Sequence, residues 1–570
     1  MNPSPKPRPP FSEPAYAAPS SPHPIDLRLD RNEGRGPDQA VVDALQGCDS
    51  AALRQYPSCR GLESDIATRF GIAAERVVVT AGGDDAIQRL CRAFLGPGRS
   101  LVVPTPTFEM IPRIAGWEGA PIVTVDWHGP RYPTDAVLQA AKPQTRMVAM
   151  VSPNNPTGGW ATSDDLIRVS QALPHAVVMV DAAYAEFGDA NLTETALTLP
   201  NAVVLRTFSK AQGLAGLRIG YAMGPEPLIN AMRSAGLPYP VSQPSILMAR
   251  SAFGRGTEPP AYVDAVVAER RLLAETLTEC GWNARPSQGN FVFAQGPDER
   301  WFQEAMAAMG IAIRCWPDSS ELAGSVRITC PGDAADFTRV TSAIRTALQP
   351  EAILFDMDGV LADVTRSYRT AIIETVNAFG GHTTPSAIEQ VKQSGDANND
   401  WRVTQRILAS QGIDADLSAV QSRFDGLYNG DGGIPGLHEN ETLIGTADDL
   451  RALRERVKLA VVTGRPRLEA ERFLIRFGIE SCFDVLVTAD DAPSKPSPEP
   501  VRLAMSQLGV RHAWMIGDTP DDLVAARSAS ALPIGICGDG PSADAVGRSL
   551  AESGAARTLT DWTDIRGVLP

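Results

Sequence analysis

The stretch that decides the fold of the first half of the chain is LRTFSKAQGLAGLRIGY, Leu205–Tyr221. It begins within an apolar, β-branched run, Val203–Thr207, and continues into small and polar residues. A short buried strand followed by a polar loop is typical of open α/β sheets, whose ligands gather at the carboxyl ends of the strands. The sequence therefore predicts a ligand site at Ser209 and Lys210.

Similar short apolar runs alternate with amphipathic segments on both sides of this stretch. The predicted strands are Val77–Thr80, Leu101–Val103, Met147–Val151, Val177–Val180 and Gly220–Ala222. This alternation predicts a mostly parallel sheet flanked by helices.

After Pro240 the pattern changes to that of a smaller α+β lobe. Its predicted elements are a helix at Tyr262–Cys280, strands at Asn290–Phe293 and Val326–Thr329, and a helix at Ala334–Leu348.

A second α/β pattern begins at AILFDMDGVLAD, Ala352–Asp363, and only Gln349–Glu351 separate it from the preceding helix. Asp356 and Asp358 follow its first strand. With one residue between them, their side chains can point the same way. Paired carboxylates repel each other, and a divalent cation is the usual reason for tolerating that repulsion. The pattern therefore favours a metal-dependent site.

Composition narrows the possible functions. A chain of 570 residues exceeds what one hydrophobic core usually supports, so several domains are expected. The net charge of −15, without a Lys/Arg cluster, argues against a nucleic-acid partner. No apolar run of about 18 residues predicts a membrane span. The eight cysteines are scattered without C-x-x-C pairs, which predicts reduced thiols in a cytoplasmic protein.

The predicted domains follow from these patterns. Residues 1–24 contain nine prolines and are expected to form a disordered arm. The first module is expected at 25–348, with its large domain at about 50–240 and its small lobe, joined by the N-terminal segment, at about 241–348. The second is expected at 352–570, including a helical cap at about 366–458.

Two further motifs precede residues 205–221: VSPNNPTGG at Val151–Gly159 and VMVDAAYAEF at Val178–Phe187. In this order, the three motifs resemble the fold-type-I aminotransferases, and most closely the histidinol-phosphate aminotransferases. The resemblance covers about residues 25–348. It implies an α/β fold with a large domain and a small α+β lobe, pyridoxal 5′-phosphate as cofactor, and transamination as the activity.

The resemblance also implies roles for individual residues. Lys210 would hold the cofactor covalently and move a proton between the substrate Cα and the cofactor C4′. Asp181 would pair with the protonated pyridine nitrogen. The other expected cofactor contacts are Asn155 and Tyr184 at the phenolic oxygen, Phe108 against the ring, and Thr207, Ser209, Arg218 and the backbone of Gly83 and Asp84 at the phosphate.

The substrate is implied less closely. Asn32, Arg314 and Arg327 match substrate-binding positions, although either arginine could instead be solvated at a strand edge. Tyr56 resembles the residue that reaches the cofactor phosphate of a neighbouring subunit, which implies a homodimer. The chain departs from the family pattern at three positions, namely Gly34, Phe108 and Ala182.

Three motifs join AILFDMDGVLAD in the second half: VVTGR at Val461–Arg465, DAPSKPSPEP at Asp491–Pro500 and MIGDTPDD at Met515–Asp522. Together they resemble the haloacid dehalogenase superfamily. The resemblance implies a Rossmann-like core with a helical cap, and Mg²⁺-dependent hydrolysis of a phosphate monoester through an aspartyl phosphate.

In this scheme Asp356 would attack phosphorus, and Asp358 would protonate the leaving oxygen and then activate water. Thr463 and Lys495 would hold the phosphoryl group. The expected metal ligands are Asp356, Asp518 and the backbone carbonyl of Asp358, with Asp522 supporting them.

The leading hypothesis is a bifunctional enzyme that catalyses consecutive steps, transamination and dephosphorylation, to give histidinol. A second hypothesis keeps both chemistries in another biosynthetic pathway, because the departures at Gly34, Phe108 and Ala182 leave the substrate open. A third holds that the phosphatase-like module is regulatory and not catalytic. The two active-site sets, centred on Lys210 and Asp356, are common to the first two.

Overall fold

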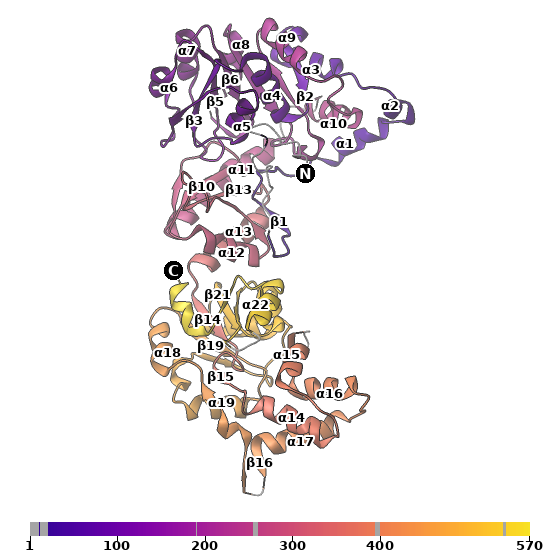
Figure 1. Ribbon diagram of the computed structural model, residues 1–570, viewed down its shortest axis with the longest axis vertical. Helices are drawn as coiled ribbons and strands as arrows, with labels where there is room; N and C mark the ends of the chain where they lie inside the picture. The colour runs from indigo at the N-terminus through magenta and orange to yellow at the C-terminus, as the bar shows by residue number, and fades with distance from the viewer. Residues whose placement is uncertain are drawn as a thin grey trace, which may run out of the picture. The chain divides into compact units, whose positions relative to one another are not determined.

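The computed structural model describes residues 11, 21–189, 191–254, 260–393, 399–431, 433–539 and 543–569. The predicted N-terminal arm lies outside these residues, apart from residues 11 and 21–24. The chain forms two compact units (Figure 1). The first contains Arg28–Glu299 and Ile313–Thr338, and the second contains Ser20–Leu27, Arg300–Ala312 and Arg339–Pro570. None of the described helices has the length and apolarity that crossing a membrane requires.

The first unit is built on a seven-stranded sheet with the order β2-β8-β7-β6-β5-β3-β4. The strands are β2 (Val77–Thr80), β3 (Ser100–Thr105), β4 (Ile122–Asp126), β5 (Thr145–Val151), β6 (Val177–Asp181), β7 (Ala202–Thr207) and β8 (Gly220–Met223). Only β8 runs antiparallel to its neighbours. The predicted mostly parallel sheet is therefore confirmed. Sequence reasoning missed β4, an edge strand whose residues are mostly exposed.

Alternating side chains of these strands form two separate cores, one on each face of the sheet. Val78 and Val103 face the core that α4 (Gly82–Phe94), α5 (Met110–Trp117) and α9 (Glu226–Ala235) cover. Val79 and Val102 face the opposite core, which is covered by α3 (Arg60–Phe70), α7 (Ser163–Ala172) and α10 (Gln243–Gly254). A sheet with both faces covered can bury every strand residue, which explains the continuous apolar runs.

The small lobe of the first unit is an antiparallel sheet with the order β12-β13-β10-β9. Its strands are β9 (Asn283–Arg285), β10 (Phe291–Gln295), β12 (Arg314–Cys315) and β13 (Ser325–Thr329), and α11 (Pro260–Glu279) packs on it. Arg314 of β12 stands directly opposite Arg327 of β13. This register places two positive charges side by side.

The second unit contains a six-stranded parallel sheet with the order β20-β19-β14-β21-β22-β23. The strands are β14 (Ala352–Phe355), β19 (Lys458–Val462), β20 (Val485–Val487), β21 (Ala513–Gly517), β22 (Leu532–Ile536) and β23 (Arg557–Leu559). Every residue of β14 is buried, because a strand lies on each side of it and helices cover both faces.

A helical segment is inserted between β15 (Ala362–Asp363) and β18 (Thr442–Leu443), which pair antiparallel. It contains α14 (Tyr368–Ala378), α15 (Pro385–Gln393), α16 (Asp400–Ser410) and α17 (Leu417–Asn429). The inserted segment therefore runs from 364 to 441. Helix α18 (Ala447–Arg454), which the predicted cap at about 366–458 included, packs instead against η6 (Glu480–Cys482) beside the sheet.

The position of Leu354 at the centre of β14 allows a test of the second core. Leu354→Ala should lower the free energy of unfolding of that unit by about 2–5 kcal/mol, because it leaves a cavity between packed layers. Chemical denaturation would measure the change. Leu468→Ala, at a site where the side chain is 77% exposed, should change it by less than about 0.5 kcal/mol. Equal losses in both variants would contradict the assigned core.

Candidate active sites

A cavity of about 750 Å³ opens in the first unit at the carboxyl ends of β5, β6 and β7. The residues predicted to bind the cofactor and the substrate, apart from Tyr56, lie together in its lining. These are Asn32, Gly83, Asp84, Phe108, Asn155, Asp181, Tyr184, Thr207, Ser209, Lys210, Arg218, Arg314 and Arg327. The strands end at one edge of the sheet, so residues distant in sequence converge there.

Lys210 lies in the loop after β7, and its amine donates a hydrogen bond to the backbone oxygen of Arg31 at 3.1 Å. Burial, and to a smaller extent the positive charge of Arg327, lower the pKa of this amine to about 8. A lysine with a lowered pKa is more often neutral near physiological pH, and only the neutral amine is a nucleophile. The site therefore suits covalent capture of an aldehyde.

Asp181 ends β6 and is buried at the base of the cavity. Burial raises the pKa of its carboxyl to about 6, while the backbone N–H of Ala183, which donates to it at 3.1 Å, acts in the opposite direction. A buried carboxyl with so little compensation would be stabilised as the anion by a cationic partner. A protonated ring nitrogen meets that requirement.

The rim of the cavity offers donors for an anion. Gly83 and Asp84 lie in the first turn of α4, where backbone N–H groups are unpaired within the helix. Arg218 reaches the same point and lies 3.0 Å from the Asp84 carboxylate. A Cβ at Gly82, where φ is +84°, would come within 3.0 Å of the Arg218 guanidinium. Glycine therefore lets the Arg218 guanidinium lie close to the N-terminus of α4, where both can face an anion.

A second cationic group lies in the small lobe. Arg327 is buried, and it donates to the backbone oxygen of Asp30 at 2.7 Å and to the side chain of Asn155. The ring of Trp316 lies near both arginines, with the Arg314 guanidinium 5.4 Å and the Arg327 guanidinium 5.7 Å from its centroid. Sequence reasoning missed Trp316, which follows β12 directly and whose contact with the two arginines no local pattern indicates.

Asn155 and Tyr184, which were predicted at the phenolic oxygen, line the cavity together with Asn32, which was predicted to bind the substrate. The amide of Asn32 donates to the Tyr184 hydroxyl at 3.0 Å, which places both side chains at one wall. Tyr56 does not line the cavity: it is 81% exposed and stacks on Tyr239 with ring centroids 4.5 Å apart.

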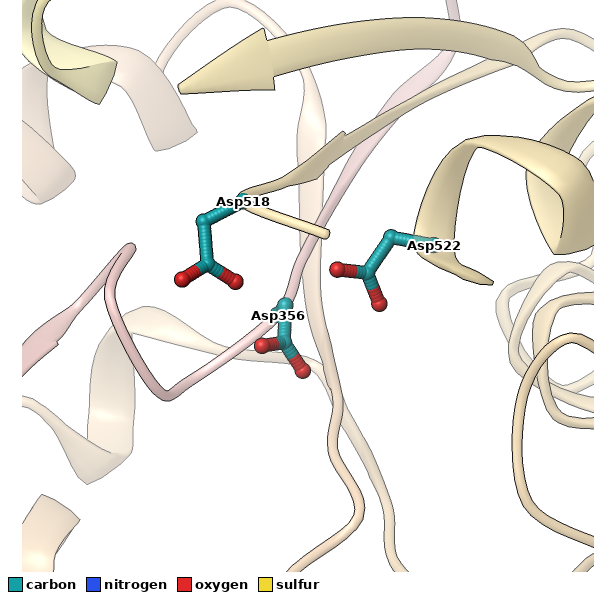
Figure 2. A group of neighbouring side chains, drawn as sticks. All are labelled: Asp356, Asp518 and Asp522. Carbon is teal, nitrogen blue, oxygen red and sulfur yellow. The ribbon is translucent and has the colours of Figure 1, made fainter. Parts of the chain in front are cut away.

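In the second unit, Asp356, Asp518 and Asp522 converge just beyond the sheet, as Figure 2 shows. One carboxylate oxygen from each lies within 4.8 Å of the others. Asp356 follows β14 and Asp518 follows β21, whereas Asp522 lies in the first turn of α21 (Pro520–Ser528). Hard oxygen ligands in this number and spacing fit Mg²⁺ or another divalent cation.

Electrostatics supports that fit. Burial raises the pKa of the Asp518 carboxyl well above its usual range, and the negative charges of Asp522 and Asp356 raise it further. The Lys495 amine relieves part of the repulsion: it lies 2.6 Å from Asp356 and 2.5 Å from Asp522, and donates to the backbone oxygen of Val462 at 3.1 Å. Lys392 also lowers the pKa of Asp518, but its amine lies 3.0 Å from Asp400, so the three carboxylates still carry more negative charge than Lys495 alone balances.

Thr463, Asp358 and Arg465 complete the second site. Thr463 follows β19, and its hydroxyl oxygen accepts the backbone N–H of Arg465 at 3.1 Å. The Asp358 carboxylate lies against Arg465, with 2.7 Å between Oδ1 and Nε, and its negative charge contributes, after burial, to raising the pKa of Asp356. Its expected metal contact, through the backbone carbonyl, does not require the side chain. Sequence reasoning gave Arg465 no role, although a charged residue at the end of the motif VVTGR was a usable signal.

Residues 25–344 match the family model of aminotransferase class I and II, which is more than half of the chain. The chain belongs to this aminotransferase family. In this aminotransferase, residues 350–530 match a second family model, that of the haloacid dehalogenase-like hydrolases. Both resemblances inferred from the motifs, and the predicted α/β fold class, are thereby confirmed.

Curated relatives match different parts of the aminotransferase chain. An imidazoleglycerol-phosphate dehydratase from Phytophthora nicotianae is 43% identical over 227 residues, 37% of this chain and 50% of the relative. The chain thus spans about half of that relative's length. An aromatic amino acid aminotransferase from Cutibacterium acnes is 34% identical over 305 residues, 51% of this chain and 86% of the relative. Histidinol-phosphate aminotransferase 1 from Arabidopsis thaliana is 34% identical over 317 residues, 53% of this chain and 74% of the relative.

A solved structure shares the fold of the aminotransferase module. Histidinol-phosphate aminotransferase from Sinorhizobium meliloti, solved with pyridoxal 5′-phosphate, matches with a TM-score of 0.52 and 23% identity, over 57% of this chain and 92% of that one.

Gly359 gives a test of the aspartate cluster. It has a φ of +76°, and a Cβ added there would lie 2.1 Å from Asp518 Oδ2. Gly359→Ala should therefore displace Asp518 and weaken Mg²⁺ binding, measured by calorimetry, by about tenfold or more. Gly478→Ala is the matched control, because Gly478 has a φ of +64° and no atom within 4 Å of the new Cβ. If the two variants bound Mg²⁺ equally well, the cluster would not be the metal site.

Proposed function

We propose that the chain is a bifunctional enzyme that transfers an amino group with pyridoxal 5′-phosphate and hydrolyses a phosphate monoester with Mg²⁺. The observation that carries this proposal is the presence of two chemically complete sites on one chain. One combines Lys210 with Asp181 in a cavity, and the other combines Lys495 with the aspartate cluster. We further propose that residues 349–351 form the boundary along the chain between the two enzyme domains.

In the first site, the bound cofactor would act as an electron sink for the substrate carbon. Lys210 would hold the cofactor and carry the proton that leaves and returns during transamination, which its lowered pKa favours. Asp181 would face the ring nitrogen, with Asn155 and Tyr184 at the phenolic oxygen and Phe108 on the ring face. The phosphate would lie at the α4 N-terminus, held by Thr207, Ser209 and Arg218.

In the second site, Asp356 would attack phosphorus and displace the alcohol, and Asp358 would exchange protons with the alcohol and then with water. Thr463 and Lys495 would hold the transferring group. Mg²⁺, held by Asp356, Asp518 and the carbonyl of Asp358 with Asp522 in support, would neutralise its charge.

For the substrate we propose consecutive reactions: transamination of imidazole-acetol phosphate, then dephosphorylation of the resulting amino alcohol to histidinol. Relatives named for histidinol phosphate and for imidazoleglycerol phosphate support this choice. So does the register of Arg314 opposite Arg327, because like charges in direct opposition are unfavourable unless an anion binds between them.

A second candidate keeps both chemistries but uses an aromatic amino acid in the first. The relative named aromatic amino acid aminotransferase and the Trp316 ring beside both arginines favour it. A phosphatase-like module that regulates but does not catalyse is the third candidate. The complete set of Asp356, Lys495 and Asp518 argues against it.

We also propose that the protein is a cytoplasmic homodimer. Tyr56, Tyr239, Leu53 and Leu237 expose 57–81% of their surface in the first unit, which suits a covered interface. All eight cysteines lie among the described residues and none forms a disulfide, as expected in a reducing compartment.

A product assay on the purified chain tests the main proposal. Imidazole-acetol phosphate with glutamate should yield histidinol and free phosphate, measured by chromatography and a phosphate assay. Lys210→Ala should abolish amino transfer and leave hydrolysis of added histidinol phosphate intact, whereas Asp356→Asn should stop the reaction at histidinol phosphate. Turnover of aromatic keto acids alone would favour the second candidate. Phosphate release that persists in Asp356→Asn would rule out the assigned nucleophile.

The lowered pKa of Lys210 predicts the pH dependence of cofactor capture. Burial moves the pKa of the amine down to about 8, so the neutral, reactive form accumulates as pH rises through 8 and not through the usual 10.5. The rate at which the cofactor-free protein captures pyridoxal 5′-phosphate, followed by absorbance, should therefore rise between about pH 7 and 9 and level off above. A rate still rising steeply above pH 9.5 would contradict this.

A further inference from the structure

Arg465 is a buried arginine of the second unit whose guanidinium touches Asp358. Its side chain is only 1% exposed and stacks on Tyr368, with 4.9 Å from Cζ to the ring centroid. Nε donates to Asp358 Oδ1 at 2.7 Å, and Nη2 lies 2.5 Å from the same oxygen. Among the described residues, Asp358 Oδ2 accepts no hydrogen bond, and the Asp358 side chain is 25% exposed. One carboxylate oxygen is therefore held and the other is available.

The rest of the guanidinium is held by the inserted segment. Nη1 donates to the Tyr428 hydroxyl and to Glu441 Oε2, both at 3.1 Å, and Nη2 donates to Glu441 Oε1 at 3.1 Å. A guanidinium carries five N–H groups. Four of them donate in these contacts and in the hydrogen bond from Nε to Asp358, and Nη2 is also in ion-pair distance of Asp358. All three nitrogens of Arg465 are therefore engaged by the protein itself. This argues against direct substrate binding.

The partners of Arg465 lie where the chain crosses between the sheet and the inserted segment. Glu441 immediately precedes β18, and its carboxylate accepts the hydroxyl of Ser367, which follows β15 by four residues, at 2.9 Å. Tyr368 comes next, and its hydroxyl donates at 2.5 Å to Glu469 of α19 (Arg467–Arg476). Arg465 thus contacts Tyr368 after β15 and Glu441 before β18, and it holds Asp358 at the same time.

We infer that Arg465 is a positioning residue: it holds Oδ1 of Asp358 so that Oδ2 faces the reacting oxygen, and it links this orientation to the placement of the inserted segment. The inference rests on the proposed phosphatase function. When Asp356 bonds to phosphorus and the bond from phosphorus to the alcohol oxygen breaks, Oδ2 gives its proton to that oxygen. When water then attacks phosphorus and frees Asp356, Oδ2 takes a proton from the water.

The dependence on the leaving group tests this role. p-Nitrophenolate leaves phosphorus without a proton, whereas an alkoxide requires one. In the full chain with Mg²⁺, Arg465→Lys and Arg465→Met should release p-nitrophenol in the first turnover within about threefold of the wild-type rate. With glycerol phosphate, kcat should fall by about 100-fold or more while KM changes by less than about threefold, because general-acid catalysis contributes factors of about 10²–10⁴.

Arg476→Met is the matched control. Arg476 lies on α19 and is exposed. It also contacts the inserted segment, because it donates to the backbone oxygens of His438 at 2.9 Å and Glu439 at 2.7 Å. It does not touch Asp358. It should lower both rates equally or not at all. If Arg465→Met were to unfold the unit, Glu441→Gln, which loosens one side of the guanidinium, should shift the ratio of the two rates in the same direction.

A double-mutant cycle decides whether Arg465 acts through Asp358. In an Asp358→Asn background, Arg465→Lys should change the remaining rate by less than about twofold, because coupled residues are not additive. Full additivity, equal losses on both substrates, or a raised KM on both would overturn the inference. A wild-type enzyme that releases phosphate from neither substrate would instead refute the proposed phosphatase function.

Discussion

Burial of charged groups at the carboxyl ends of parallel strands is the constraint on which both sites depend. Asp181 ends β6 and Asp356 follows β14, and both are buried, whereas Lys210, which follows β7, is partly buried in the wall of the cavity. Desolvation disfavours the charged form, which is why the pKa of Lys210 falls to about 8 and that of Asp181 rises to about 6. Such groups are costly in isolation, and a ligand of matching charge offsets the cost.

The two sites meet this cost in different ways. In the first, Asp181 has one backbone hydrogen bond, so a ligand must supply most of its compensation. In the second, the protein supplies part of it, since Lys495 lies between Asp356 and Asp522. Lys392 also acts on Asp518 but is paired with Asp400 at 3.0 Å, so the three carboxylates still carry more negative charge than Lys495 balances, and a divalent cation would reduce that excess. The chemistry of each site follows from the charge that its own residues leave uncompensated.

Sequence alone predicted the elements whose signal is local and strong. The buried strands and the helix α13 (Ala334–Leu348) were found because their apolar residues follow a regular period. The individual site residues were assigned because their motifs resemble those of two known families. The edge strand β4 was missed because its residues are mostly exposed. Trp316 and Glu441 were missed because their roles arise from register and from contacts across the inserted segment, which no local pattern encodes.

The proposed consecutive reactions place two opposite demands on phosphate recognition. The first site must hold a phosphate ester without breaking it, and the second must break it. Arg314 and Arg327 are permanent cations in a cavity where the proposed reactive group, Lys210, would act on a carbonyl carbon, so they suit binding alone. In the second site the proposed nucleophile, Asp356, lies beside Asp518, Asp522 and Lys495, so the same phosphate would be neutralised and attacked in one place. Under the proposed sequence of reactions, the ester survives the first site because no nucleophile is aimed at its phosphorus, and not because it is bound weakly.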